Sequence, residues 1–542
     1  MTLENKKPPE NNGDDPRKWS SHNGRDYFRL LGESEYAYYV PASRDGLNDM
    51  FLHSSFTVKS KGTVMDPSRI AVCWAITRSH HPLLMAKVIR DRNSQTSQDE
   101  PFLPPEDAVK EATESLVFNT LSKDELISNY LNGSRTLSDE RMSYLVISTS
   151  SDLGTFANND EGKYDILMCA PHFIGDGASL HQCTHELMTL LSSPQTTHDL
   201  AQSLIRPLNW VRLVDLLPPA LESRLPLLSS GIGKAAAKVN YLQTLHREIG
   251  GHTLRRLQRE PKKTVMVEKS FTEEDTAKML AKCKRSGVTI NHALFALCNV
   301  AWGHSNLDFR AIESPIMMYT ALNLRPFLTP HPSTTYWFLA LTYFNVVLPS
   351  FVPGTIAAFW NRAHSVKAQT RKVVQSPFLP SRAMTGARTR AARARGTLSA
   401  VSTSNAASVT DTADSLPASI NDVQAAGGSI KIPPAPSAAL FGLSLIGNLD
   451  NIYTQSASYS RKHLSPTSAY ASPTIPLSSM ITIHTVTTAS RQKPGGLLLL
   501  EHTFAKKLWL HLCWDVNGFE VGHIERFLEC LEDAVEELLI SS

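Results

Sequence analysis

The chain has 542 residues, and its 54 lysine and arginine residues against 51 aspartate and glutamate residues give a net charge of +3. This balance gives no support to a protein that binds nucleic acid or another polyanion. With 42% hydrophobic and 19% charged residues, the composition excludes a disordered chain, and the length allows two or more domains.

The polar residues 1–25 predict a flexible N-terminal tail. Strand-like and helix-like segments then alternate over residues 26–205, which we expect to form an N-terminal lobe. The apolar patterns predict helices at 67–77, 106–131 and 178–191 and strands at 83–89, 141–150 and 164–170. Residues 206–262 carry a helical pattern broken at Pro218-Pro219 and Gly250-Gly251, which suits a helical bridge between two halves.

Residues 263–542 are expected to form a C-terminal lobe. Strands are predicted at 264–270, 315–324, 338–348, 439–447, 481–488, 497–504 and 508–514, and helices at 272–286, 289–302 and 521–539. Residues 380–437 are rich in Ser, Ala, Thr, Arg and Pro, which predicts a mobile insertion. The two halves contain similar sets of strands and helices, which indicates an α/β (α+β) protein with two similar lobes.

The seven cysteines form no Cys-x-x-Cys pair, and several lie in apolar runs. This pattern predicts buried free thiols in a reducing compartment and makes a zinc site improbable. The first 25 residues contain no apolar signal core, and the longest strongly apolar stretch, Tyr336 to Pro349, is too short to span a bilayer. We therefore expect a cytoplasmic protein without a membrane span.

The most informative segment runs from Pro171 to Gly177 and contains His172, Gly175 and Asp176. It lies between the strand predicted at 164–170 and the helix predicted at 178–191. A rigid strand would aim the His172 imidazole, and the glycine-flanked turn would leave room for a substrate, which favours a proton-transfer base.

The spacing His-x-x-x-Asp alone is weak, since a chain of this length contains on the order of one by chance. Two other copies, beginning at His22 and His304, lack the strand and helix that flank His172. An alternative interpretation is an ordinary turn histidine, with Asp176 as the N-cap of the following helix.

Four further segments stand in a fixed order around this motif: Leu31-Gly32-Glu33-Ser34-Glu35, His81-Pro82-Leu83, Gly287-Val288-Thr289-Ile290-Asn291 and Ala321-Leu322-Asn323-Leu324-Arg325-Pro326. Together with the His172 motif they resemble the coenzyme-A-dependent acyltransferase superfamily over roughly residues 27–540. The first of them resembles the family's opening strand. Within this superfamily the pattern is fungal in character and resembles trichothecene 15-O-acetyltransferases and related alcohol acyltransferases. The plant enzymes' Asp-Phe-Gly-Trp-Gly is absent, and Gly447-Asn448-Leu449-Asp450-Asn451 stands in its place.

The resemblance implies two lobes like those of chloramphenicol acetyltransferase, with mixed sheets and an active-site tunnel between them. His172 would act as general base, removing a proton from an acceptor that then attacks the thioester of an acyl-coenzyme A. Asp176 would be structural and pair with Arg325, whose alternative is a surface position beside Pro326. A Cβ at Gly177 would crowd the donor or distort the turn.

Ser444 and Asn448 are candidate hydrogen-bond donors to the oxyanion, or plain strand-end polar residues. Gly175 and Asn323 are candidate contacts to substrate or donor. The arginines between residues 382 and 395 could meet coenzyme A phosphates, although a solvated flexible loop explains them as well. His181 and His185 lie opposite the apolar stripe of their helix with no third ligand in spacing, so we expect solvent-facing histidines and no metal site.

The resemblance thus predicts an O-acyltransferase for a hydroxyl of a fungal-type secondary metabolite, such as a terpenoid or polyketide alcohol. Its co-substrate would be an acyl-coenzyme A, acetyl-coenzyme A first, with no permanently bound cofactor. We expect a monomer whose partners are these small molecules and not nucleic acid. Two alternatives stay open: a condensation-type enzyme that takes its acyl group from a carrier protein, and a non-catalytic binding protein on the same fold.

Overall fold

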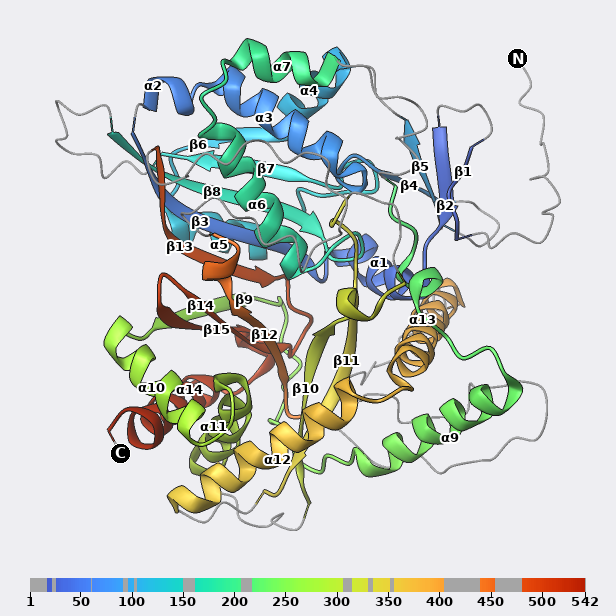
Figure 1. Ribbon diagram of the computed structural model, residues 1–542, viewed down its shortest axis with the longest axis vertical. Helices are drawn as coiled ribbons and strands as arrows, with labels where there is room; N and C mark the ends of the chain where they lie inside the picture. The colour runs from blue at the N-terminus through green and yellow to red at the C-terminus, as the bar shows by residue number, and fades with distance from the viewer. Residues whose placement is uncertain are drawn as a thin grey trace.

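The computed structural model of the chain forms two lobes, each built around a β-sheet with helices packed on it (Figure 1). It describes residues 17–21, 26–59, 61–90, 96–101, 105–149, 161–205, 217–305, 314–329, 335–350, 355–403, 439–453 and 480–541. Both large sheets contain parallel and antiparallel pairs. The predicted α/β class, with two lobes and mixed sheets, is confirmed.

The N-terminal lobe has a five-stranded sheet in the order β13-β3-β8-β7-β6. Its strands from this half of the chain are β3 (Asp49–Lys59), β6 (Leu116–Asn119), β7 (Tyr144–Ser148) and β8 (Glu161–Pro171). Its helices are α1 (Glu33–Asp45), α2 (Lys61–Val64), α3 (Pro67–His80), α4 (Pro105–Glu114), α5 (Lys123–Asn132), α6 (Gly177–Leu191) and α7 (Thr197–Ile205). A smaller sheet has the order β1-β2-β5-β4, formed by β1 (Ser20–Ser21), β2 (Asp26–Leu30), β5 (Thr96–Pro101) and β4 (Lys87–Arg90).

Several predictions for this lobe are wrong in detail. The single helix expected at 106–131 is two helices separated by β6, because Leu116-Val117-Phe118 pairs in parallel with β7. The segment 31–35 is not a strand, since β2 ends at Leu30 and α1 begins at Glu33. Residues 82–84 form a short 3₁₀ helix, η1 (Pro82–Leu84), and only 87–90 of the strand expected at 83–89 is extended.

The C-terminal lobe has a six-stranded sheet in the order β11-β10-β12-β14-β15-β9. The strands are β9 (Thr264–Ser270), β10 (Ile316–Asn323), β11 (Leu341–Leu348), β12 (Gly442–Asn448), β14 (Leu497–Phe504) and β15 (Lys507–Asp515). The helices are α10 (Glu273–Arg285), α11 (Ile290–Ser305), α12 (Ile356–Val374), α13 (Leu379–Thr403) and α14 (His523–Val535), which continues as the π-helix η10 (Glu536–Ile540). Apart from α12, which was not predicted, and α13, these elements lie where the sequence patterns place them.

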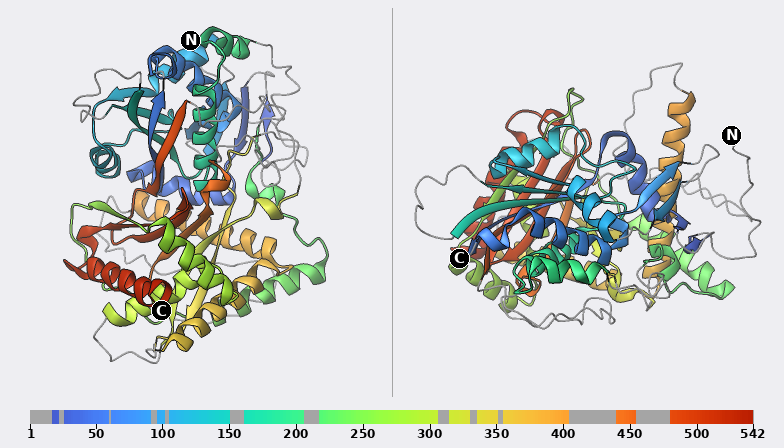
Figure 2. Two further views of the ribbon diagram at one scale, coloured as in Figure 1. Left: turned by 60° about the vertical axis from the view of Figure 1, so that its left-hand side comes forward. Right: turned by 90° about the horizontal axis from the view of Figure 1, so that it is seen from above.

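One strand crosses between the lobes. Strand β13 (Ile481–Ser490) was expected in the C-terminal lobe, but it pairs antiparallel with β3 at the edge of the N-terminal sheet, from Ile481↔Val58 to Ser490↔Met50 (Figures 1 and 2). The next strand, β14, returns to the C-terminal sheet between β12 and β15. The alternation of residues predicts a strand but not its partner, so the domain boundary drawn at residue 263 is wrong for this segment.

The helix α13 occupies the start of the region predicted to be a mobile insertion. Its buried residues Ala383, Met384, Ala387 and Ala391 recur at helical spacing, and the helix packs against α1 (Figure 1). The small apolar stripe, rather than the overall composition, decides the structure here. The prediction is therefore wrong for residues 380–403, and residues 404–438 lie outside the described part.

The structure describes parts of the predicted N-terminal tail (1–25) and of the predicted bridge (206–262). Residues 17–21 do not form a flexible tail, because β1 pairs with β2 and the Trp19 indole donates a hydrogen bond to the carbonyl of Pro218 at 2.9 Å. The rest of the 1–25 segment lies outside the described residues. The bridge contains the short helix η2 (Leu221–Arg224) and the predicted helical structure as α9 (Gly231–Arg247), whereas residues 248–262 carry no regular element.

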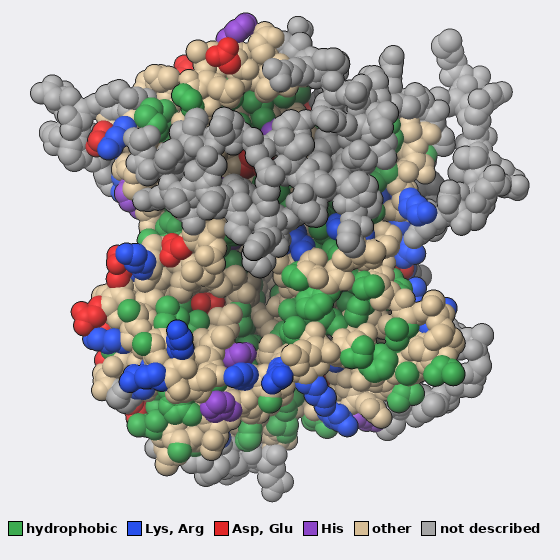
Figure 3. Space-filling view, viewed as in Figure 1, with side chains coloured by type: hydrophobic (Ala, Val, Ile, Leu, Met, Phe, Trp, Pro, Cys, Tyr) green, Lys and Arg blue, Asp and Glu red, His purple; other side chains and the backbone are tan. Residues whose placement is uncertain are grey.

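The seven cysteines are free thiols, and all but Cys530 are buried, as predicted. Among the described helices, none combines the length and apolar character needed to cross a bilayer. The face shown in Figure 3 carries charged side chains of both signs, with lysines and arginines dispersed over the lower lobe.

The exchanged strand should contribute measurably to stability. Val486 of β13 is fully buried, so Val486→Ala should lower the free energy of unfolding by about 2 kcal/mol through lost apolar burial and a residual cavity. Val521→Ala, at a position that is 89% exposed, serves as control and should change it by less than about 0.5 kcal/mol. Urea unfolding of both variants measures the difference, and equal effects would contradict the packing of β13.

Candidate active site

The turn that carries His172 joins β8 to α6, as the sequence predicts. Strand β8 ends at Pro171, helix α6 begins at Gly177, and the amide of Ile174 donates to the Pro171 carbonyl at 3.3 Å. The side chains of Phe173 and Ile174 are buried and anchor the turn in the core. His172 lies between the end of strand β8 and these two buried residues, and it is partly exposed.

The tautomer of His172 follows from one hydrogen bond. Its Nδ1 lies 2.9 Å from the carbonyl oxygen of Gly175. A carbonyl oxygen only accepts, so Nδ1 carries the proton and Nε2 of the neutral ring carries the free lone pair. Burial lowers the pKa of His172 below its ordinary value, which keeps the ring neutral near pH 7. A neutral imidazole with a fixed tautomer is suited to accept a proton at Nε2.

His172 lies where the two lobes meet. The ring of Tyr38, from α1, stacks on the imidazole with centroids 4.5 Å apart and an interplanar angle of 25°. The Tyr38 hydroxyl is hydrogen-bonded to the hydroxyl of Tyr343 on β11, in the C-terminal lobe. Tyr319 on β10 contacts Tyr343 edge to face at 6.0 Å. We call Tyr38, Tyr319 and Tyr343 the tyrosine cluster.

Asp176 and Arg325 form the predicted ion pair across the lobes. Arg325 Nη1 donates to Asp176 Oδ2 at 2.9 Å, and the two side chains are only 8% and 1% exposed. Oδ2 also accepts from the amide of Ala340, while Oδ1 accepts from the amide of Ser179 as an N-cap. Burial would raise the pKa of Asp176, but the charge and hydrogen bond of Arg325 outweigh it and hold this pKa below its usual value. The predicted pairing with Arg325 and the N-cap alternative are therefore both confirmed.

Arg325 also binds the backbone of the segment 335–340 in the C-terminal lobe. Its Nη2 donates to the carbonyl of Phe338 at 2.7 Å and to that of Tyr336 at 3.2 Å. Asn323 Oδ1 accepts from the Arg325 amide at 3.0 Å and from Nη1 at 3.3 Å. Asn323, a candidate contact to substrate or donor, is thus a partner of Arg325 in this structure.

A second polar network holds the same segment and was not predicted. Glu186 of α6 accepts from Tyr336 Oη at 2.6 Å and contacts His81 Nε2 at 2.9 Å. The other nitrogen of His81 lies 2.7 Å from the hydroxyl of Thr335. His81 belongs to the His-Pro-Leu segment noted in the sequence, but nothing in the spacing indicates Glu186 as its partner.

The two glycines of the motif differ in their surroundings. A Cβ added to Gly175 would lie 3.0 Å from Trp337 Cε2, so the close approach of the Trp337 ring favours glycine there. A Cβ at Gly177 would meet its nearest neighbour, Ile446 Cδ1, only at 4.0 Å. The expectation that this Cβ would distort the turn is therefore wrong, because the protein leaves room for it; crowding of a donor stays a prediction.

Ser444 and Asn448, the oxyanion candidates, occupy different environments. A Cβ added to Gly442 would overlap the Tyr319 ring, and Ser444 lies two residues along β12, on the same face of the strand. Ser444 therefore shares the face of the tyrosine cluster and is partly buried. Asn448 is exposed, and its Oδ1 accepts from the amide of Asp450 at 2.9 Å as the cap of η6 (Leu449–Asn451).

The arginine run lies on the ordered helix α13, so the flexible-loop interpretation is wrong for it. The guanidinium of Arg390 lies over the Tyr343 ring, 5.2 Å from its centroid. Arg395 pairs with Glu33 of α1 at 3.0 Å, and Arg388 and Arg393 are exposed. One member of the run therefore borders the tyrosine cluster.

His181 and His185 are not solvent-facing. They are 0% and 5% exposed, because the C-terminal lobe covers the side of α6 that an isolated lobe would expose. His181 Nδ1 lies 3.1 Å from Tyr453 Oη, and its ring is 6.4 Å from that of His502. Within the described ranges, no group of His, Cys, Asp and Glu has the arrangement of a metal site.

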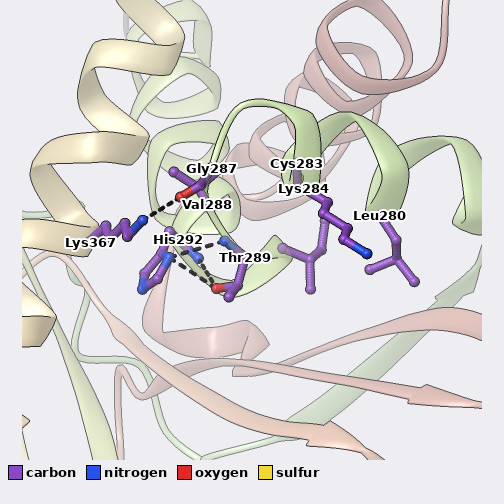
Figure 4. Close-up of a pocket in the computed structure, with 9 residues that line it drawn as sticks. Leu280, Cys283, Lys284, Gly287, Val288, Thr289, His292 and Lys367 are labelled. Carbon is purple, nitrogen blue, oxygen red and sulfur yellow. Dashed lines mark hydrogen bonds between the residues drawn. The ribbon is translucent and has the colours of Figure 1, made fainter.

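A cavity of about 430 Å³ lies elsewhere in the C-terminal lobe, between α10, α11 and α12 (Figure 4). Lys367 Nζ donates to the Gly287 carbonyl at its rim, and His292 Nδ1 accepts from the Thr289 amide at 3.1 Å. Burial raises the pKa of Cys283, one of its lining residues, to about 11, so this thiol stays protonated near pH 7. The cavity contains none of the residues of the His172 motif.

The sequence matches no protein-family model, and no curated protein sequence matches it. The structure is similar to TRI3 trichothecene 15-O-acetyltransferase from Fusarium sporotrichioides, with a TM-score of 0.73 and 12% identity over 96% of this chain and 98% of that one. It is also similar to the condensation domain of the Monacolin K polyketide synthase MokA, with a TM-score of 0.55 and 13% identity over 97% and 98% of the two chains.

A further similar structure is SgcC5 from Streptomyces globisporus, with a TM-score of 0.51 and 12% identity over 94% of this chain and 98% of that one. The chain therefore has the fold of the TRI3 acetyltransferase and of condensation domains, in agreement with the fold that the resemblance implied. At these identities the similarity is one of fold.

The buried Asp176–Arg325 pair should contribute strongly to the free energy of unfolding. Asp176→Asn removes the charge that compensates Arg325 and should lower the free energy of unfolding by about 3 kcal/mol. Glu520→Gln is the matched control, because Glu520 pairs with Arg255 on the exposed surface and should contribute less than about 1 kcal/mol. Chemical denaturation compares the two, and an unchanged midpoint for Asp176→Asn would argue against the pairing.

The buried histidines should make the fold sensitive to acid. Burial, with a smaller contribution from His511, lowers the pKa of His181 to about 3, and burial lowers that of His185 to about 4. Unfolding restores values near 6.5, so the unfolded chain binds more protons and stability is lost as pH falls below 6.5. The loss is about 1.4 kcal/mol per pH unit for each histidine.

His181→Gln should therefore flatten the dependence of unfolding free energy on pH between 6.5 and 4. The control His246→Gln changes an exposed histidine of α9 and should leave the slope unchanged. An identical slope in His181→Gln and wild type would show that His181 is not buried in the neutral form.

Proposed function

We propose that this protein is an O-acyltransferase that moves an acyl group from acyl-coenzyme A to a hydroxyl of a secondary-metabolite alcohol. Acetyl-coenzyme A is the proposed donor and a terpenoid or polyketide alcohol the proposed acceptor. The observation that carries the proposal is the fixed tautomer of His172, which presents a free Nε2 lone pair at the junction of the lobes.

In this mechanism the acceptor hydroxyl donates its proton to His172 Nε2 as its oxygen attacks the thioester carbonyl carbon. A C–O bond forms, and the carbonyl oxygen becomes an oxyanion that needs a hydrogen-bond donor. Ser444, on the face of the tyrosine cluster, is the proposed donor, and the amide nitrogen of Asn448 is the second candidate. The C–S bond then breaks, and the imidazolium returns its proton to the departing thiolate, so no covalent acyl-enzyme forms.

The surrounding residues act on the geometry of this step. The Asp176–Arg325 pair fixes the turn at the start of α6 and the segment 335–340 relative to each other. The space in front of Gly177, where the nearest side-chain atom is Ile446 Cδ1, is the proposed path of the thioester. The role of Gly177 is then to keep this path clear.

A condensation-type reaction is the second candidate, because the MokA condensation domain shares the fold over 97% of the chain. It would use the same base and a carrier-bound thioester as donor. Comparing acetyl-coenzyme A with an acylated carrier protein, at equal concentration and with the same alcohols, separates the two. Binding of both donors without transfer would instead favour a non-catalytic binding protein.

His172→Ala should remain folded and lose about 10²–10⁴-fold in acyl transfer, because general-base assistance is removed. Release of free thiol from acetyl-coenzyme A over a panel of terpenoid and polyketide alcohols measures the rate. His304→Ala is the control, since His304 begins another His-x-x-x-Asp sequence but lies exposed on α11. Retention of most activity in His172→Ala would refute the imidazole as base.

A further inference from the structure

We propose that Tyr38 is a positioning residue for the base: its aromatic face stabilises the imidazolium that forms on His172 during the reaction, and its hydroxyl bond to Tyr343 holds it there. The inference rests on the proposed function of His172. It adds a residue from α1 that belongs to none of the sequence motifs.

The contact has the geometry of an aromatic stack. The two rings lie 4.5 Å apart at 25°, with the imidazole over the face of the phenol ring rather than at its edge. A neutral imidazole gains a modest stacking energy in this position. Once the imidazole has taken a proton it becomes a cation over the negative face of an aromatic ring, and the attraction increases. The stack therefore favours the charged ring that forms on proton transfer over the neutral ring of the resting state.

Few other charged groups in the site stabilise the imidazolium. Burial disfavours the charged ring, and the Asp176 carboxylate, which favours it, is already paired with Arg325. The carbonyl of Gly175 accepts from Nδ1 in both protonation states. The Asp176 carboxylate and the Gly175 carbonyl also favour the protonated ring, and Tyr38 adds a π face that contacts the face of the imidazole.

The hydroxyl of Tyr38 fixes the ring in place. It is hydrogen-bonded to Tyr343, whose other neighbours are the Arg390 guanidinium at 5.2 Å and the Tyr319 ring at 6.0 Å. Tyr38 comes from the N-terminal lobe and Tyr343 from the C-terminal lobe, 305 residues apart. The stack on the base therefore depends on the contact between the lobes.

The proton balance leaves Tyr38 unchanged. The proton moves from the acceptor hydroxyl to His172 Nε2 and then to the thiolate of the leaving group, while Tyr38 neither gives nor takes one. This distinguishes its role from that of a second acid or base, and it allows the ring and the hydroxyl to be tested by separate substitutions.

The test compares three variants. Tyr38→Leu keeps bulk but removes the aromatic face, and we expect the pKa of His172 to fall by about one unit and kcat to fall about tenfold. Tyr38→Phe keeps the face and removes the hydroxyl, so the pKa should stay within about 0.3 units of wild type while kcat falls a few-fold. Tyr343→Phe should reproduce that loss, and the double variant should be no worse than either single one.

The His172 pKa is measured by NMR titration of its Cε1–H signal, assigned with His172→Ala, and from the acidic limb of kcat/KM against pH. Tyr36→Leu is the control, because Tyr36 lies on the same helix under the Arg395 guanidinium and should leave both quantities unchanged. An unshifted pKa in Tyr38→Leu would overturn the inference, whether or not activity falls. Since the titration needs no turnover, it gives its answer even if full activity in His172→Ala were to refute the proposed function.

Discussion

The Arg325 guanidinium is almost completely buried, and the arrangement of the site depends on the groups that compensate its charge. One guanidinium meets the Asp176 carboxylate, the Ser179 hydroxyl and carbonyls of the segment 335–340. Leaving a buried cation unpaired is expensive, so the first turn of α6 and the C-terminal lobe have one favourable relative position. The turn that carries His172 ends at that helix, and its geometry is set by the same pair.

A second layer of contacts reinforces this junction from both sides. The Glu186–His81–Tyr336 network holds the segment 335–340 against α6 and the end of α3. On the other side of His172, Tyr38 and Tyr343 join α1 to β11. His172, the proposed base, is thus held by its own backbone turn and by groups from both lobes, and proton transfer at a fixed atom requires preorganisation of this kind.

The sequence predicted those features that short segments encode. Strand β8 and helix α6 follow from the local pattern of residues, whereas the Asp176–Arg325 pair follows from the resemblance of two short segments to those of a known family. Features that depend on which surfaces meet do not follow from such segments. The single apolar stripe of α6 indicates one covered face and so predicts a solvent-facing His181, and the pattern of β13 predicts a strand without identifying its sheet. The sequence pattern predicts a helix at Leu116-Val117-Phe118, because the strand that pairs with this segment is distant in the sequence. Tyr38 carries no signal at all until its neighbours are seen.

The strand exchange has a consequence for how the molecule can be divided. Strand β13 supplies the edge of the N-terminal sheet from residues 481–490, far beyond the bridge between the lobes. A fragment that stopped at the bridge would lack this strand and would leave the edge of β3 unpaired along the nine residues from Met50 to Val58. Such an edge invites pairing with other chains. The sheet of the N-terminal lobe is therefore complete only in a chain that includes residues 481–490.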